Sequence, residues 1–408
     1  MSKWTKENNQ DKALKIILFF ISPFIAALYS VRNMNTKSSY LVFFLFAVFF
    51  GMAFTVSNDR SEYAGDGAHY RATFEDYYSY ISDIEYYDGL REFLTFDEGK
   101  KDYYFDTLSF YISEYTSNYH WMFMVAAMVF AFFALKSLRF LTSERNFDFS
   151  YSSLLLVYLF MVNGIFNING LRFWTAAWVG VYCIFQIFRN NDKRYFLLLL
   201  FTPFIHGSFW FLIALIVIIY FFKRYNKTWI TLFFISFFVG NIAVEVLQDI
   251  SAYLPTFIQR LIASYTSEEN LDRFSRGSGF IWVRRLMGFS VRLYLFLMIY
   301  FFIQHANKIK STPATRNLYL FLIPYMTIIN LTLSIPSFGN RYMPLAYPVI
   351  AYIWLVHFKD VKYKVFLQHL PLVFWFSIYH NILTKYPSVT DLSFYITNPF
   401  SLIYKYLF

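Results

Sequence analysis

The sequence predicts an all-α polytopic membrane protein with about 11–12 transmembrane helices and with loops on the external face of the membrane. Of the 408 residues, 57% are hydrophobic and only 15% are charged, whereas a soluble domain carries about 25% charged residues. The charged residues are clustered and leave long apolar runs between them. The short connections are basic and one long connection is acidic, a distribution typical of membrane topology.

The apolar runs define the predicted spans. A bilayer crossing takes about 20 apolar residues, with a range of about 17–25. Several runs are at or below this length, so we expect some short helices that neighbouring helices shelter. The spans are Leu14–Val31, Tyr40–Val56, His120–Leu141, Tyr151–Val162, Phe173–Phe188, Tyr195–Phe222, Thr228–Leu247, Leu286–Ile303, Leu318–Leu333, Met343–Phe358 and Val365–Ile382.

The charges of the connections predict which side each one faces. Cytoplasmic loops carry an excess of Lys and Arg. The short basic connections are Lys136–Arg145, Arg189–Arg194, Lys223–Lys227, Lys308–Arg316 and Lys359–Lys364. The Ser57–Tyr119 segment holds 14 acidic and five basic residues and twelve Tyr, which places it outside. The net charge of +10 is therefore a topology signal and predicts no nucleic-acid partner.

Alternation of sides fails at one place. Arg189–Arg194 and Lys223–Lys227 are both basic, yet a single 28-residue run joins them. The simplest interpretation is a helical hairpin that turns near Pro203–Gly207, because Pro and Gly interrupt helices. The alternative is one tilted helix, which would invert every later loop. The side of the amino terminus stays open, since Lys3–Lys15 and Arg32–Lys37 are also basic around one apolar run.

The chain is predicted to form one membrane domain, residues 1–408, with two substantial external loops. The first is the acidic, Tyr-rich segment 57–119 and the second is 248–285. The second contains an amphipathic stretch suited to the membrane interface. Its apolar residues are Phe257, Leu261 and Ile262, and its polar residues are Gln259 and Arg260. With the hairpin, Asn163–Arg172 and Ser334–Asn340 also lie outside.

No nucleotide-binding or metal-binding motif is present. The sequence lacks a Walker loop, a dinucleotide-binding glycine pattern, CxxC and HExxH, and the seven His residues have no metal spacing. No DxD pair stands on an external loop. We therefore expect no cofactor and no metal, and any catalysis would come from Arg, His and carboxylates at the outer face.

Two arginines open helices directly after polar, external segments. Arg172 follows the polar break that ends in Asn169-Gly170, and Arg341 follows Ser334–Asn340. A guanidinium binds phosphate oxygens bidentately, and a helix start adds free N–H donors for the same anion. An intramembrane Arg usually faces a cavity. The pair is thus a candidate diphosphate clamp, and arginines that extend to lipid headgroups are the alternative.

Arg284 and Arg285 close the second external loop, where they could reach a phosphate or serve as a positive anchor. His206 lies in the sequence Pro203-Phe204-Ile205-His206-Gly207-Ser208, inside the longest apolar run. An imidazole titrates near neutrality and can accept a proton from a hydroxyl group. His206 is therefore a candidate base, and a buried His bonded to a neighbouring helix is the alternative.

The start of the acidic segment contains further candidates. Asp66 stands between two glycines and could bind a sugar hydroxyl or act as a base. Asp59 and His69 are weaker candidates. The tyrosines of this segment could stack on sugars, although Tyr at this level also forms the aromatic belt of the membrane interface.

Together these motifs resemble the EpsG-type branch of the Wzy glycan polymerases. The similarity rests on Gly65-Asp66 with Tyr70, on Asn169-Gly170-Leu171-Arg172 followed by His206-Gly207-Ser208, and on Asn340-Arg341-Tyr342. It covers roughly Val56 to Phe358, with short motifs in a characteristic order. The chain departs from the family pattern at Phe173, where Gln is common, and at Thr175-Ala176, where a Leu-Ala pair is common.

The resemblance implies a bacterial inner-membrane glycosyltransferase with a GT-C-like architecture. Such enzymes polymerise repeat units carried on undecaprenyl diphosphate at the outer leaflet, without a metal, as O-antigen ligases also act. Arg172, Arg341, Arg284 and Arg285 would then bind the diphosphate, and His206 or Asp66 would be the base. Asn169, Tyr70 and Tyr342 would contact sugar. Membrane lipids and a chain-length regulator protein are the further partners implied.

Two other functions are compatible with the same features. A glycan ligase would use the same site with a different acceptor. A flippase or exporter would perform no chemistry, but transporters usually bind at the midplane and often contain inverted repeats. The sequence shows no repeat, and its polar breaks gather on one side, which favours an enzyme.

Overall fold

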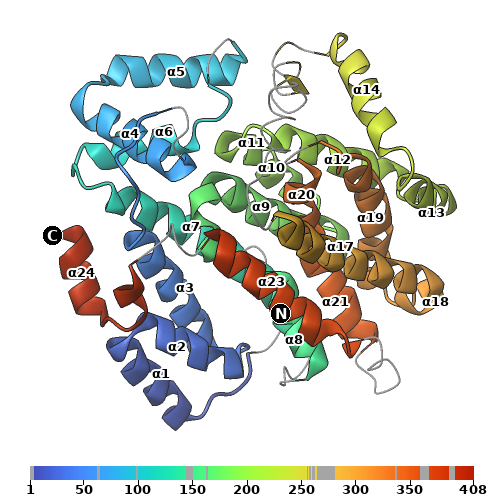
Figure 1. The fold of residues 1–408 in the computed structure, drawn as a ribbon, viewed down its shortest axis with the longest axis horizontal. Coiled ribbons are helices and arrows are strands. Elements are labelled where there is room, and N and C mark those ends of the chain that lie inside the picture. Colours follow the sequence, from blue (N-terminus) through green and yellow to red (C-terminus); the bar gives the residue numbers. More distant parts are fainter. Residues whose placement is uncertain are drawn as a thin grey trace.

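The computed structural model describes residues 4–61, 65–97, 100–143, 150–161, 164–254, 256, 259, 262–263, 281–335, 338–358, 367–385 and 391–408. Across these residues the secondary structure is helical and contains no strand (Figure 1). The predicted all-α membrane fold is confirmed. The described residues include three stretches long and apolar enough to span a membrane, at His120–Thr142, Ser152–Arg189 and Leu286–Gln304. Most other predicted spans are shorter helices or pairs of helices.

The first apolar run forms a helical hairpin, so the prediction of one span at Leu14–Val31 is wrong. Helix α1 (Asn9–Ile21) ends at Ser22, and α2 (Pro23–Ser30) begins at once, because Ser22 caps it and Pro23 suits a first helical position. The Tyr29 hydroxyl donates to Asp11 over 2.8 Å. The two ends of the run therefore lie side by side.

A buried lysine fixes this hairpin against α3 (Lys37–Met52). Lys15 Nζ lies 2.6 Å from Glu7 Oε1 and 2.8 Å from Asp11 Oδ2. It also donates to Thr36 Oγ1 and to Ser38 Oγ, each over 3.2 Å. The basic segments on both sides of the first run thus lie at the same end of the molecule.

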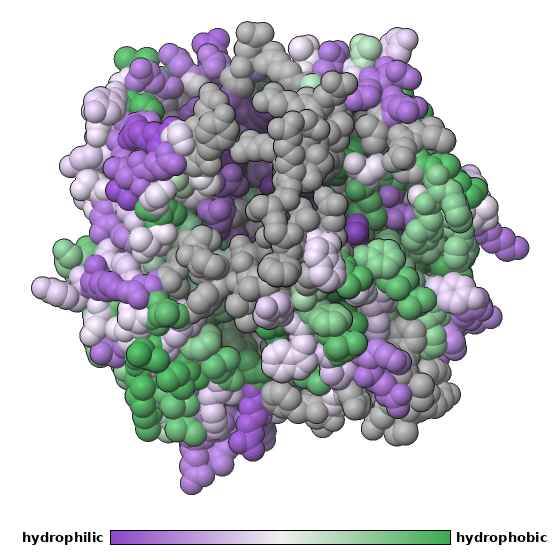
Figure 2. All heavy atoms as spheres, in the orientation of Figure 1, coloured by the Kyte–Doolittle hydropathy of each residue, from purple (hydrophilic) through white to green (hydrophobic). Residues whose placement is uncertain are grey.

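The acidic segment 57–119, predicted as a loop, folds into three helices with a small aromatic core. These are α4 (Asp66–Ser79), α5 (Asp83–Thr95) and α6 (Tyr104–Ser113). A capping box between Ser82 and Glu85 begins α5. The core residues are Tyr77, Tyr86, Tyr103 and Phe110. Hydrophilic side chains gather over α4–α6 at the upper left, and hydrophobic ones over α1 and α2 at the lower left (Figure 2).

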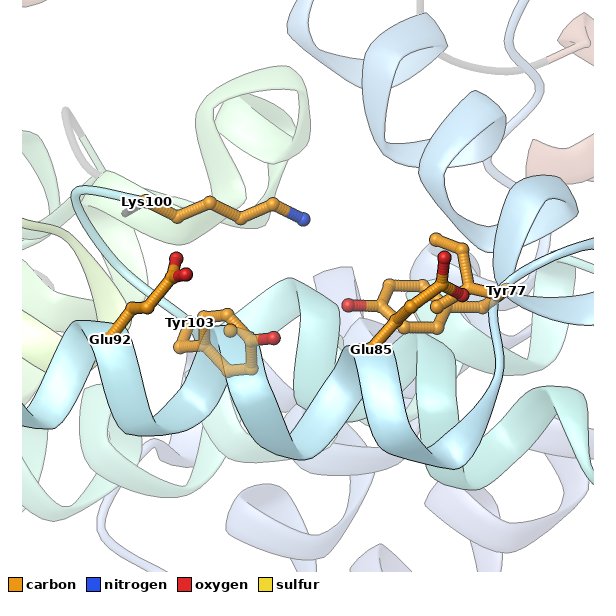
Figure 3. Close-up of a pocket in the computed structure, with 7 residues that line it drawn as sticks. Tyr77, Glu85, Glu92, Lys100 and Tyr103 are labelled. Carbon is orange, nitrogen blue, oxygen red and sulfur yellow. The ribbon is translucent and has the colours of Figure 1, made fainter. Parts of the chain in front are cut away.

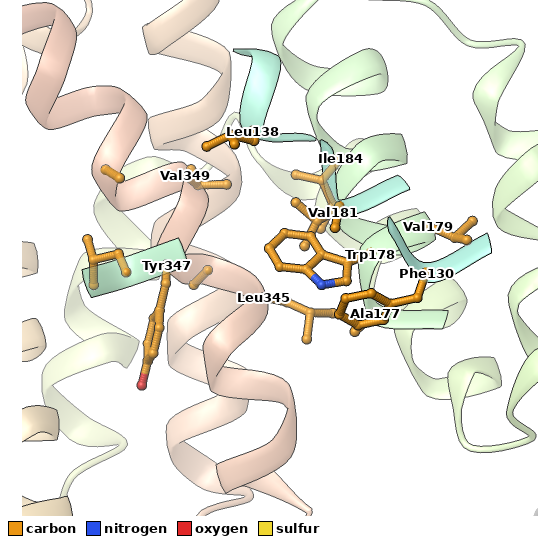
Figure 4. Packing of buried hydrophobic residues seen from close by; sticks show 14 of the residues in the cluster. Phe130, Leu138, Ala177, Trp178, Val179, Val181, Ile184, Leu345, Tyr347 and Val349 are labelled. Atoms are coloured by element: carbon orange, nitrogen blue, oxygen red, sulfur yellow. The ribbon is translucent and has the colours of Figure 1, made fainter. Parts of the chain in front are cut away.

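The centre of the molecule is built on α7 (His120–Thr142), α8 (Tyr151–Met161) and α9 (Leu171–Ile184). A 3-10 turn, η2 (Ile165–Gly170), leads into α9, and a π-helical turn, η3 (Phe185–Arg189), ends it. Trp178 of α9 is buried beside Phe130 of α7 and is surrounded by aliphatic side chains (Figure 4). This packing fixes the middle of α9 against α7.

The second ambiguous run also forms a hairpin, as predicted. It consists of α10 (Tyr195–Leu199), α11 (Thr202–Ile205) and α12 (Phe209–Phe222), with extended backbone at His206 between them. The rings of Phe196 and Tyr220 lie 5.4 Å apart, and Lys223 lies in the electrostatic field of Lys193. Both basic ends are therefore adjacent, and the turn lies at the opposite end.

The remaining helices follow in chain order. The predicted span Thr228–Leu247 is interrupted, because α13 (Asn226–Ile235) ends before α14 (Gly240–Ser251) begins. The others are α17 (Ile281–Gln304), α18 (Ala306–Ile309), α19 (Pro313–Leu331), α20 (Gly339–Tyr342), α21 (Tyr347–His357), α23 (Leu370–Lys385) and α24 (Pro399–Leu407). A 3-10 turn, η4 (Met343–Ala346), links α20 to α21.

Candidate functional site

The carboxylate of Asp102, in the connection between α5 and α6, links the start of α9 to the turn of the second hairpin. Asp102 Oδ1 lies 2.6 Å from Arg172 Nη1 at the start of α9. Asp102 Oδ2 accepts a 3.2 Å hydrogen bond from the backbone N–H of Gly207 in the second hairpin. Burial raises the pKa of the Asp102 carboxyl, while the Arg172 charge and the Gly207 N–H favour its ionised form. Asp102 therefore ties the hairpin turn to Arg172.

Gly207 is the residue that allows this close approach. A Cβ atom at position 207 would collide with the backbone carbonyl oxygen of Lys101. The same two segments are also joined by a backbone hydrogen bond, in which the Tyr103 N–H donates to the Phe204 carbonyl over 3.0 Å. The turn is thus held against the α5–α6 connection through backbone contacts.

Arg172 retains hydrogen-bonding capacity after it pairs with Asp102. Its guanidinium carbon lies 5.4 Å from the centre of the Tyr70 ring, and its side chain is 31% exposed. Within the part of the chain that the structure describes, its buried Nε–H has no hydrogen-bond partner. A buried donor without a partner is costly, but this atom is enclosed, so an anion would reach Arg172 through the exposed part of its side chain.

His206 stands at the head of a chain of hydrogen bonds. Its Nδ1 lies 2.8 Å from Ser208 Oγ, which lies 2.9 Å from the Tyr342 hydroxyl. That hydroxyl donates to the Ser208 carbonyl over 2.7 Å. The carbonyl of Tyr342 in turn accepts from the Tyr325 hydroxyl over 2.8 Å. These bonds fix the imidazole between the second hairpin and α20.

Both predicted clamp arginines act on this histidine. The positive charges of Arg172 and Arg341, together with that of Lys101, contribute to the electrostatic field at His206. Arg341 also lies over the ring of Phe173, with 5.8 Å between its guanidinium carbon and the ring centre. The Phe173 ring meets His206 edge-on at 5.2 Å. The ring of Phe173, a position where the family often has Gln, thus contacts both Arg341 and His206.

A third arginine approaches from inside a candidate span. Arg292 of α17 donates to Asn340 Oδ1 over 3.5 Å, beside Arg341. Neither Arg292 nor Arg341 makes an ion pair within the described ranges. An intramembrane Arg without a carboxylate partner indicates a functional site. This residue was missed in the sequence, although its position inside an apolar run could have identified it.

Several predicted site residues are near this centre. Asp66 is exposed at the start of α4 and contributes to the electrostatic field at Arg172. Asn169 Oδ1 accepts from the Gly67 N–H over 3.0 Å, so α4 and η2 are joined there. The fold therefore brings together the predicted site residues Asp66, Asn169 and Arg172, which belong to two separate sequence motifs.

Two predicted sugar contacts have other roles in the structure. Tyr342 is only 1% exposed and its hydroxyl is bonded to Ser208. Tyr70 is buried against Phe105, with ring centres 4.1 Å apart, and lies beneath Arg172. A buried aromatic ring presents no face to a ligand. Both residues therefore position other side chains, and of the three predicted sugar contacts only Asn169 is exposed.

The other candidates contribute less to the site. The side chains of Arg284 and Arg285 lie outside the described residues, as does most of the predicted amphipathic stretch of segment 248–285. Asp59 is bonded to the backbone N–H of Ser61 over 2.8 Å, which holds a local turn. Among the described residues, no three His, Cys, Asp or Glu side chains are grouped as metal ligands.

The fold and site define a class: an all-helical membrane protein with three arginines, a histidine and a buried carboxylate gathered at one end of the helices. Comparison with known protein families then shows to which family of this class the chain belongs. The model of the EpsG family matches residues 42–397, and the chain belongs to that family. The family indicates a membrane protein of the polysaccharide-polymerase type. No curated protein and no solved structure matches the chain.

Proposed function

We propose that this protein polymerises oligosaccharide repeat units carried on undecaprenyl diphosphate, by glycosyl transfer that uses no metal. The observation that carries the proposal is that both arginines lie near His206. Asp102 links Arg172 to Gly207, and the Phe173 ring contacts both Arg341 and His206. Two cations are placed around one candidate base: Arg172 comes from the start of α9, whereas Arg341 lies in the last turn of the four-residue helix α20 and does not open a helix as predicted. This arrangement suits a reaction in which a diphosphate leaves while a hydroxyl group loses a proton.

The arginines supply the charge stabilisation. In the transfer, the acceptor hydroxyl oxygen bonds to the anomeric carbon of the donor sugar, and the bond from that carbon to the diphosphate oxygen breaks. The departing oxygen gains negative charge, which preorganised donors stabilise most strongly in a site with little water. The exposed part of the Arg172 side chain and the guanidinium of Arg341 would be the donors for this oxygen. Arg292 would hold the same anion from the α17 side.

His206 is the favoured base, in preference to Asp66. The Ser208 backbone N–H donates to His206 Nδ1 over 3.3 Å, and the Ser208 hydroxyl lies 2.8 Å from the same atom. His206 would take the proton of the acceptor hydroxyl on Nε2 in the tautomer in which Nδ1–H donates to the Ser208 hydroxyl, which gives up the bond from the Ser208 N–H. Asp66, at the exposed start of α4, would instead bind a sugar hydroxyl.

The membrane geometry supports an external site. Lys223 lies in the electrostatic field of both Lys193 and Arg316, at the end of the second hairpin opposite to His206, and basic loops face the cytoplasm. The site end would then face outward from a bacterial inner membrane, where lipid-linked repeat units are consumed. The growing chain would be the donor and a new repeat unit the acceptor.

The proposal is tested by incubating the purified protein with its lipid-diphosphate-linked repeat unit and a chelator, and by separating the glycans on a gel. A ladder of multiples is the expected result. A single unchanged band, from protein shown to be folded, would contradict the polymerase. Transfer of intact glycan to a different acceptor under the same conditions would identify a ligase instead.

A further inference from the structure

The acidic helical unit α4–α6 contains a cavity that is broadly open to solvent and lies close to the candidate site. Its volume is about 400 Å³, and ligand pockets in proteins typically measure about 300–1,000 Å³. The lining residues are Tyr77, Ile81, Glu85, Gly89, Glu92, Lys100 and Tyr103. In Figure 3, Glu85 and Glu92 extend from the side of α5 that faces Lys100.

One face of α5 is shaped around this space. Glu85, Gly89 and Glu92 follow one another at helical spacings of four and three residues, so they share a face. A Cβ atom at Gly89 would lie 2.5 Å from the Tyr103 hydroxyl oxygen. The absence of a side chain at position 89 therefore lets the Tyr103 hydroxyl pack against α5, where it forms the wall of the cavity between the two carboxylates.

The polar atoms around the cavity are mainly hydrogen-bond acceptors. Glu85 uses Oε2 to cap Ser82, which leaves Oε1 available. Within the described ranges, the Glu92 carboxylate has no hydrogen-bond or ion-pair partner and is exposed. Lys100 is paired with Asp106 and retains two N–H donors. A ligand that fits must donate several hydrogen bonds and must not carry a negative charge.

The cavity is coupled to the candidate site through four consecutive residues. Lys100 and Tyr103 line it, while Lys101 packs on Gly207 and Asp102 pairs with Arg172. The ring of Phe93, from α5, also lies 5.9 Å from that of Phe204 in the second hairpin. A glycan whose diphosphate lies at Arg172 therefore has this cavity within reach of its sugar residues.

We propose that the cavity binds one sugar residue of the glycan, and that it selects a neutral or amino-bearing sugar over an acidic one. This inference rests on the proposed function, because it assumes that the nearby site handles a glycan. Sugar hydroxyls donate to Glu85 and Glu92 and accept from Lys100. An ammonium group gains a charge-assisted bond to a carboxylate. A uronic acid places its carboxylate beside two others and is rejected.

The experiment measures binding in detergent by saturation-transfer nuclear magnetic resonance. The probes are methyl glucoside, methyl glucosaminide with a free amine, and methyl glucuronide, which share one ring. The variants are Gly89→Leu, whose side chain would displace the Tyr103 hydroxyl from the cavity wall, and Glu92→Gln, which removes one charge at an exposed position. Glu114→Gln is the matched control, since Glu114 is exposed on the same helical unit and does not line the cavity.

The expected result is transfer to the glucoside and glucosaminide and none to the glucuronide. Glu92→Gln should weaken glucosaminide binding about tenfold, the loss of one hydrogen bond to a charged group, and Glu114→Gln should leave it unchanged. Equal transfer to all three probes, or transfer unaffected by Glu92→Gln, would overturn the inference. Because binding needs no turnover, these outcomes are independent of the polymerisation test. Glu92→Gln also stays informative if Gly89→Leu fails to fold.

Discussion

The two helical hairpins solve the same topological problem but differ in the chemistry of their turns. Each is an apolar run with basic segments at both ends, and each folds back so that those ends lie together. The first turn is closed by the Ser22 hydroxyl, which donates to the Tyr395 carbonyl over 2.8 Å. The second turn carries His206 to Arg172 and Arg341. A shared device of the fold thus serves packing in one place and a site in the other.

The difference shows where polar groups are stabilised. In the first hairpin the charged residues lie at the base, where Lys15 is enclosed by Glu7 and Asp11. In the second, the charges lie at the turn and are only partly compensated, since one carboxylate, Asp102, serves Arg172. Compensated charges favour a fixed structure, and uncompensated cations favour an anionic ligand.

Replacing the histidine of the second turn should have the largest effect. His206→Gln removes the proposed base while keeping a polar side chain, and loss of general-base catalysis costs about 10²–10⁴ in rate. Ser22→Ala, in the first turn, should leave the rate per folded molecule within threefold of the original. The measurement is the initial rate of glycan-ladder formation. A His206→Gln rate within threefold of the original would remove His206 from the mechanism.

Replacing the lysine of the first hairpin should destabilise the protein without altering its chemistry. Lys15→Met leaves Glu7 and Asp11, which are partly exposed, without their buried cation, so the loss in stability should be smaller than the roughly 3–5 kcal/mol of a fully buried pair. Thermal unfolding in detergent should begin at a lower temperature, and the rate per folded molecule should be unchanged. An unchanged unfolding temperature would show that the cluster does not hold the hairpin.

The smallest expected effect concerns the hydrogen-bond chain behind His206. Tyr342→Phe removes bonds to Ser208, and one buried hydrogen bond contributes about 0.5–1.5 kcal/mol, so kcat should fall by up to about tenfold with KM unchanged. Because Ser208→Ala interrupts the same chain, the double variant should lose little more than either single variant. Additive losses would indicate that the two residues act separately.

The sequence predicted the second hairpin because its flanking charges contradicted simple alternation. The first run had the same charge pattern, but its only breaker is Ser22-Pro23 and the buried role of Lys15 depends on contacts with Thr36 and Ser38. Such contacts cannot be read from hydropathy. The predicted acidic loop was also incomplete, since the helix face of Glu85, Gly89 and Glu92 becomes apparent only with the Ser82 capping box.

The candidate site was predicted in its cations and missed in its supporting residues. Arg172, Arg341 and His206 lie at or just after polar breaks in apolar runs, so they can be identified from the sequence alone. Asp102 is one of 14 acidic residues in its segment and is 70 positions from Arg172 in the chain. Nothing local distinguishes it from the others. The buried positions of Tyr70 and Tyr342 likewise depend on packing partners distant in the sequence.

The most direct test of the central claim is the rate of glycan-ladder formation by Arg172→Gln and Arg341→Gln, with Arg189→Gln as the control. Arg189 lies at the opposite end, where its Nε donates to the Tyr352 hydroxyl over 2.8 Å. Loss of one preorganised donor costs about 10²–10³ in rate, so each of the first two variants should lose this much and the control should stay within threefold. If Arg172→Gln and Arg341→Gln also stay within threefold, the two arginines do not bind the leaving diphosphate.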